Sequence, residues 1–163
     1  GVWQLTLWAR TDDGWAVETR VVGPHGDRVA GLAFSPVEPL VVTGGADATF
    51  KLFSRRSGGG DKASAGAWIC EAVGTSRAGA AVTAVGVSRD GSAIAAACGA
   101  VVGLWSRASL DLLAVLANPA VREPARGLHF VAGGAWLVVE TPSSLAVWNL
   151  ACSLPAQQHS HGA

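Results

Sequence analysis

The sequence predicts an all-β fold built from a repeated four-stranded unit, and three observations support this. Short apolar segments that end on an aromatic residue recur along the chain. Between them lie short runs rich in apolar and β-branched residues, separated by Gly, Pro, Asp and Ser, as expected for strands joined by turns. No window holds apolar residues at the i, i+3, i+4, i+7 spacing of an amphipathic helix for long enough to form one.

The aromatic-ended segments give the length of the repeat. They are Leu5–Trp8, Phe50–Phe53, Val101–Trp105 and Leu145–Trp148, and their last residues are 45, 52 and 43 residues apart. The middle interval contains a polar, Gly- and Ser-rich stretch, residues 55–66, which we interpret as an inserted loop of about eight extra residues. Without the insertion every interval is about 44 residues, within the ~40–45 of the WD repeat, whose copies form β-propellers.

The runs between the aromatic ends supply the remaining strands of each unit. The expected strands, in chain order, are Leu5–Trp8, Trp15–Val22, Val29–Phe34, Leu40–Thr43, Phe50–Phe53, Trp68–Val73, Val82–Ser88, Ala93–Ala97, Val101–Trp105, Leu112–Leu116, Leu128–Val131, Trp136–Glu140 and Leu145–Trp148. We therefore predict a propeller segment of roughly three four-stranded blades over residues 1–154, part of a larger propeller, followed by a polar tail at residues 155–163.

Turn residues separate these strands. Ser35-Pro36 and Gly133-Gly134 lie between consecutive strands, and Asp90-Gly91 supplies the positive φ that a tight hairpin needs. Asp47 lies in the turn before Phe50–Phe53, where its carboxylate can accept hydrogen bonds from backbone N–H groups of its own turn. The alternative for Asp47 is an ordinary turn residue with no further role.

Composition limits the functional classes. Lys and Arg total 12, as do Asp and Glu, so the chain lacks the basic excess typical of broad nucleic-acid binding. Three widely spaced cysteines (Cys70, Cys98 and Cys152) favour a reducing compartment over a disulfide framework. No apolar run reaches the ~20 residues of a membrane helix. The sequence, which begins inside a strand-like run, looks like a soluble, intracellular segment of a longer polypeptide.

Motifs for catalysis or for cofactors are weak. Ser76 lies in a stretch that lacks the second glycine of a hydrolase elbow. His159 and His161 form the only close pair of Cys or His residues, the pairing that zinc sites need, in a polar tail that we interpret as solvated. The glycines of residues 58–60 are more simply a loop than a phosphate cradle. We therefore predict no catalytic, cofactor-binding or metal-binding residues, no cofactor and no enzymatic activity.

Tryptophans and a basic cluster have structural interpretations. The repeat-end residues Trp8, Trp105 and Trp148 are expected to pack between blades, and Trp15, Trp68 and Trp136 to pack within or between blades. The cluster of Arg55, Arg56 and Lys62 is interpreted as part of a solvated loop, with contact to a few RNA phosphates as the alternative.

The chain resembles the WD-repeat family in detail. "VTGGADATFKLFS" is similar to the end of a repeat, and "FSPVEPLVVTGG" and "VSRDGSAIAAA" resemble the hairpin before it. The resemblance implies a buried polar network of His25, Thr43, Asp47 and the strand tryptophan. Phe53 occupies the tryptophan position and has no N–H to donate, and the next two repeats lack a matching Asp. The resemblance therefore implies degenerate repeats.

A narrower resemblance covers nearly the whole chain. The ordered motifs "GPHGDRVAGLAFSP", "DATFKLFS", "WICEAVG", "SRDGSAIAAACGAVVGLW" and "LAVWNLACSL" are similar to the tandem-propeller nucleolar subunits of the UtpA (t-UTP) subcomplex of the small-subunit processome. Trp68–Cys70 and Trp148–Cys152 are the most individual parts of the match, because ordinary repeats do not require them.

This resemblance implies a non-catalytic scaffold in ribosome biogenesis, acting in pre-rRNA transcription and processing for small-subunit rRNA maturation in the nucleus and nucleolus. The implied partners are other UtpA subunits and processome proteins and, through the complex, pre-ribosomal RNA and snoRNA, with no membrane. One alternative is a WD-repeat interaction scaffold in another assembly. The other is a propeller enzyme that uses the central channel, where the expected inner strands offer little beyond His129.

Overall fold

The computed structural model describes residues 2–56, 66–76, 79–119 and 122–152. Its strands are β1 (Gln4–Thr11), β2 (Gly14–Val22), β3 (Val29–Phe34), β4 (Leu40–Gly45), β5 (Thr49–Arg55), β6 (Trp68–Thr75), β7 (Val82–Val87), β8 (Ala93–Cys98), β9 (Val101–Ser106), β10 (Leu112–Ala117), β11 (Gly127–Val131), β12 (Trp136–Glu140) and β13 (Leu145–Asn149). Two short 3-10 turns, η1 (Ala132–Gly134) and η2 (Leu150–Cys152), flank the last hairpin. Each expected strand is present, which confirms the all-β prediction.

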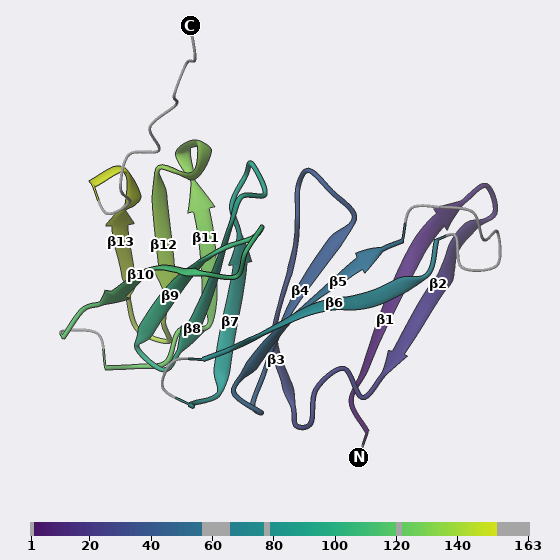
Figure 1. Ribbon diagram of the computed structural model, residues 1–163, viewed down its shortest axis with the longest axis horizontal. Helices are drawn as coiled ribbons and strands as arrows, with labels where there is room; N and C mark the ends of the chain where they lie inside the picture. The colour runs from purple at the N-terminus through teal and green to yellow at the C-terminus, as the bar shows by residue number, and fades with distance from the viewer. Residues whose placement is uncertain (1, 57–65, 77–78, 120–121, 153–163) are drawn as a thin grey trace, which may run out of the picture.

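The strands form four antiparallel sheets that fan out side by side (Figure 1). Two sheets are complete four-stranded blades, β3–β6 and β7–β10, in which each strand pairs with the next along the chain. A two-stranded sheet, β1–β2, precedes them, and a three-stranded sheet, β11–β13, follows. The first strand of the middle blade, β7, contacts both β3 and β11, so these first strands line the inner side of the fan. This is the arrangement of a partial propeller.

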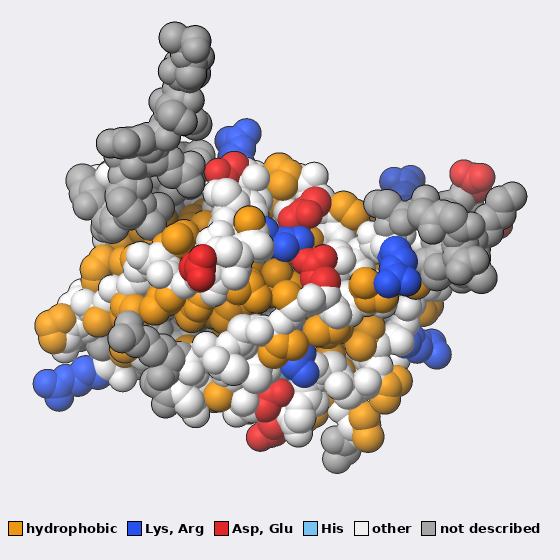
Figure 2. All heavy atoms as spheres, in the orientation of Figure 1, with side chains coloured by type: hydrophobic (Ala, Val, Ile, Leu, Met, Phe, Trp, Pro, Cys, Tyr) orange, Lys and Arg blue, Asp and Glu red, His pale blue; other side chains and the backbone are white. Residues whose placement is uncertain are grey.

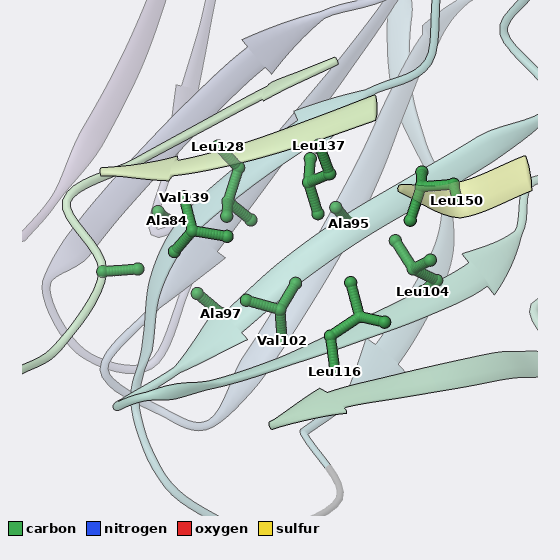
Figure 3. Close-up of a cluster of buried hydrophobic side chains, with 11 residues drawn as sticks. Ala84, Ala95, Ala97, Val102, Leu104, Leu116, Leu128, Leu137, Val139 and Leu150 are labelled. Atoms are coloured by element: carbon green, nitrogen blue, oxygen red, sulfur yellow. The ribbon is translucent and has the colours of Figure 1, made fainter. Parts of the chain in front are cut away.

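Apolar layers hold neighbouring blades together. Between β7–β10 and β11–β13, a buried cluster that includes Leu104, Leu128 and Leu137 fills the gap (Figure 3). A second cluster joins β3–β6 to β7–β10 and contains Phe50 and Trp105, whose ring centroids lie 4.8 Å apart. Because successive side chains along a strand point to opposite faces of the sheet, residues 102 and 104 face the following blade while Trp105 faces the preceding one.

Two glycines make room for this aromatic pair. A Cβ on Gly103 would overlap the Trp105 ring, and a Cβ on Gly74 would overlap the Phe50 ring. Both glycines lie within strands, where a glycine usually weakens the sheet because it has no side chain to pack. Here each ring covers the bare backbone of its glycine, which restores the lost packing.

Repeat-end aromatics follow one rule across the blades. Trp105 is 6% exposed between blades, as predicted, and Phe53 is 2% exposed in a cluster with Leu5 and Leu7 of β1. Trp148 is partly buried against the cluster between the last two blades. In each case the ring faces the preceding sheet.

The prediction that Trp8 is buried is wrong for this chain. Trp8 is 58% exposed, because the structure describes no sheet before β1–β2 for it to face. Trp15, at 71% exposed, and Trp136, at 39%, are also less buried than predicted. Trp68 packs partly against the cluster that contains Phe53, and its buried indole N–H has no partner among the described residues.

The exposed ends of the fan lead to a prediction about association. Trp8 and Trp15 leave apolar surface open at one end, and Leu145 (68% exposed) and Val147 (58%) do so on β13, an edge strand at the other. Unpaired edges and bare apolar faces favour association. The isolated 163-residue chain should therefore run in light scattering as species larger than one chain. A compact monomer would show that these blades can close by themselves.

Candidate functional site

A polar network joins the loop before β3 to strand β4 and the β4–β5 turn. The His25 side chain is fully buried, and its Nε2 lies 2.7 Å from Thr43 Oγ1. On the other side of the ring, Nδ1 lies 3.0 Å from Asp47 Oδ1 and 3.0 Å from Thr49 Oγ1. The imidazole therefore connects a strand hydroxyl to a turn carboxylate at one end of the blade.

The carboxylate of Asp47 accepts hydrogen bonds from both Gly26 and Thr49. The Gly26 N–H donates to Oδ2 at 2.8 Å, and Thr49 donates to Oδ1 through both its N–H, at 3.1 Å, and its hydroxyl, at 2.7 Å. Burial raises the pKa of Asp47, but the hydrogen bonds from Thr49, Gly26 and His25 outweigh it and lower the pKa to about 2. The carboxylate is thus held ionised as a brace between loop and turn.

The structure brings together His25, Thr43 and Asp47, as the WD-repeat resemblance implied, and Asp47 binds its own turn as predicted. Phe53 takes no part in the network and instead packs toward β1. Thr49 belongs to the network and was missed. Its position two residues after Asp47 is the signal that could have found it, because a hydroxyl there reaches back to the carboxylate.

A second network that joins a loop to a turn lies in the last sheet, with the positions of the carboxylate and the hydroxyls exchanged. Glu123 precedes β11 by four residues, as His25 precedes β3 by four. Its Oε2 accepts from the Ser143 hydroxyl at 2.7 Å, the Ser143 N–H at 3.1 Å and the Thr141 hydroxyl at 3.2 Å. The Ser143 hydroxyl is the main reason that the pKa of Glu123 is lowered. Here the carboxylate lies on the loop and the hydroxyls lie in the turn, so a search for a turn Asp misses it.

Asp47 should make blade stability depend on acidity. Its folded pKa lies below its ordinary value of 3.8, so its stabilisation is complete above about pH 4 and is lost as the pH falls toward 2. The shift corresponds to about 2 kcal/mol. In the complete propeller, Asp47→Asn should lower the free energy of unfolding at pH 7 by about that amount.

The same comparison made near pH 2.5 should show a much smaller difference, with urea unfolding followed by circular dichroism. Asp27→Asn is the matched control, because Asp27 is exposed and, among the described residues, accepts a hydrogen bond only from the adjacent Arg28 N–H. A difference between wild type and Asp47→Asn that stays constant from pH 7 to pH 2.5 would refute the assigned role of the carboxylate.

Other candidate residues have structural partners. Ser76 is 5% exposed, and its hydroxyl donates to the Ala80 carbonyl at 2.7 Å. His129 is exposed, with Nε2 3.4 Å from Glu140 Oε2. A hollow of about 280 Å³ between β3, β7 and β11 is lined by Arg126 and His129 and otherwise by Gly, Ala, Leu and Val. Across the described part of the chain, no three His, Cys, Asp or Glu residues group as metal ligands.

The predicted insert is described only at its ends. Residues 57–65 lie outside the described residues, and so do the glycines at 58–60, Lys62, His159 and His161. The predicted start of the insert is one residue early, since β5 extends through Arg55, which pairs with Trp68. Arg55 also forms an ion pair with Glu18 of β2 at 2.9 Å. Arg55 therefore links two sheets and is not part of a free basic loop.

The fan of antiparallel sheets, two of them complete four-stranded blades, and the His25–Thr43–Asp47 network define a WD-repeat β-propeller. Residues 2–159 match the family described as the second β-propeller of WD repeat-containing protein 75, and the chain belongs to this family. The match confirms the narrower resemblance found in the sequence motifs. No curated protein matches the chain. Within the described residues, no helix is both long and apolar enough to cross a membrane.

Proposed function

We propose that this chain is a non-catalytic propeller scaffold within a subunit of the UtpA (t-UTP) subcomplex of the small-subunit processome. The observation that carries the proposal is the match of residues 2–159 to the second propeller of WD repeat-containing protein 75. The role is to offer binding surface in the nucleolus to other UtpA subunits and processome proteins. Pre-ribosomal RNA and snoRNA are reached through the assembly.

Charge supports protein contacts over RNA contacts for this segment. Lys and Arg balance Asp and Glu at 12 each, so a broad phosphate-binding surface is not favoured. Two arginines are already engaged within the fold: Arg107 contacts Glu38 and Glu71, and Arg55 contacts Glu18. Exposed apolar side chains are the better candidates for affinity, since buried apolar and aromatic anchors dominate protein interfaces.

The proposal predicts both location and loss-of-function behaviour. A tagged form of the intact protein should concentrate in the nucleolus and co-purify with UtpA subunits and with the 5′ region of pre-ribosomal RNA. Its depletion should lower early pre-rRNA and block small-subunit maturation while sparing processing specific to the large subunit. Microscopy, affinity purification with mass spectrometry and RNA blotting measure these outcomes.

The alternative is a WD-repeat interaction scaffold in another assembly. A diffuse cytoplasmic protein that purifies without any processome component would favour that alternative and would contradict the ribosome-biogenesis role. The propeller fold itself would be unaffected by that result.

A further inference from the structure

A hollow of about 130 Å³ opens between the second complete blade and the last one. Its lining includes Leu104 and Leu150, which are buried, and Leu113, which is 41% exposed. Leu104 and Leu150 lie near each other at one end of the interblade cluster (Figure 3), so the hollow continues that cluster toward the surface. Neither the polar network nor the family match accounts for it.

The size of the hollow selects the kind of group that fits. An engineered cavity of about 150 Å³ lined by Leu, Ile and Phe stays dry and binds benzene. The hollow here is close to that volume, with Leu104, Phe130 and Leu150 among its walls. One phenyl ring or one branched aliphatic side chain therefore fits it, and filling it removes apolar surface from water.

The negative charge at the hollow favours a positively charged residue next to the bound apolar side chain. Of the described residues that line it, Asp90 alone is charged. Hydrogen bonds from the Ser88 hydroxyl (2.6 Å), the Ser92 N–H (3.1 Å) and the Ser92 hydroxyl (2.8 Å) fix its carboxylate in place. The Ser88 hydroxyl is the main reason that the pKa of Asp90 is lowered. A fixed anion favours an adjacent cation and disfavours phosphate.

The surroundings of Leu113 suit a protein partner. Leu112, Leu113 and Val115 on the outermost strand β10 are all exposed. Figure 2 shows hydrophobic side chains gathered across the middle of that view, over β8, β9 and β10. Exposed apolar groups around a pocket of this kind are typical of protein interaction sites.

We propose that the hollow between β7–β10 and β11–β13 is a docking site for a peptide segment of a partner protein, with a leucine- or phenylalanine-sized side chain seated in it and a lysine or arginine beside Asp90. The inference rests on the proposed function only in assuming that the bound partner is a protein. Its test uses purified intact protein and short peptides, so failure here leaves nucleolar location and co-purification untouched.

The test compares acetyl-Phe-Lys-amide with acetyl-Phe-Glu-amide and acetyl-Ala-Lys-amide by saturation-transfer NMR. Acetyl-Phe-Lys-amide should bind about fivefold more tightly than acetyl-Phe-Glu-amide, since one exposed charge pair contributes up to ~1 kcal/mol. Acetyl-Ala-Lys-amide should bind more weakly than either. In Asp90→Asn the preference for Lys over Glu should disappear while the Phe requirement remains.

Leu113→Lys tests the mouth of the hollow and should weaken acetyl-Phe-Lys-amide binding about tenfold or more. Val115→Lys is the matched control: it lies on the same strand, is 43% exposed and does not line the hollow. Equal affinity for the Lys and Glu peptides in the wild type, or equal losses in Leu113→Lys and Val115→Lys, would overturn the proposal. Self-association abolished by Leu113→Lys would overturn it in favour of a second copy as the occupant. If Leu113→Lys fails to fold, the wild-type and Asp90→Asn comparison decides alone.

Discussion

Trp105→Ala should lower the free energy of unfolding of the complete propeller by about 3–5 kcal/mol, the usual cost of emptying a large aromatic from a core. Trp105 is 6% exposed, and its ring lies 4.8 Å from that of Phe50 on the neighbouring blade. Truncation therefore removes an interblade contact as well as the packing within its own sheet. Collapse is restricted because strands on both sides hold the cavity open.

The measurement is urea unfolding followed by circular dichroism, which does not depend on tryptophan emission. Trp15→Ala is the matched control, since Trp15 is 71% exposed and its loss should change stability by less than about 1 kcal/mol. A loss below about 1 kcal/mol in Trp105→Ala would mean that the assigned phase of the repeats is wrong.

Gly103→Ala should also be strongly destabilising, by about 1–3 kcal/mol, the range for overpacking a core. A methyl group at Gly103 would overlap the ring of Trp105, which is held in place by Phe50. The ring must therefore leave its position or the strand must move. Either change separates the two complete blades.

Coupling to Trp105 makes this second prediction specific. In the Trp105→Ala background the added methyl group meets no ring, so Gly103→Ala should cost much less than in the wild type. Gly26→Ala is the matched control, because its Cβ would meet Asp47 only at an ordinary 3.7 Å. Equal losses from Gly103→Ala in the two backgrounds would show that the ring does not lie over the glycine.

Much of the fold could be predicted because its signals are local. Alternating apolar runs and Gly, Pro and Asp turns predict strands, and the spacing of aromatic ends predicts the repeat. Val29–Phe34 and Trp136–Glu140 match β3 and β12 residue for residue. Gly91 has the positive φ expected of its hairpin, at 74°. The other observed strands differ from the expected ones only at their ends.

The polar network could be predicted only in part. The resemblance to WD repeats implied the grouping of His25, Thr43 and Asp47, and the structure has it. Thr49 and Glu123 form hydrogen bonds whose partners depend on how a loop packs against a turn. The repeat spacing in the sequence does not predict that packing. The Asp90 hollow was also missed, because its walls come from separate strands and turns of two blades.

The sequence by itself determined the order of the strands along the chain and the repeat length, because these depend on residues close together or one period apart. The network that contains Asp47 was implied by the resemblance to WD repeats. Only the tertiary structure decided which aromatics are buried. Trp8 and Trp105 occupy the same repeat position, yet Trp8 is 58% exposed and Trp105 is 6%. The physical reason is that the ring at this position packs against the preceding sheet. Its burial therefore depends on a neighbouring blade and not on its own strand.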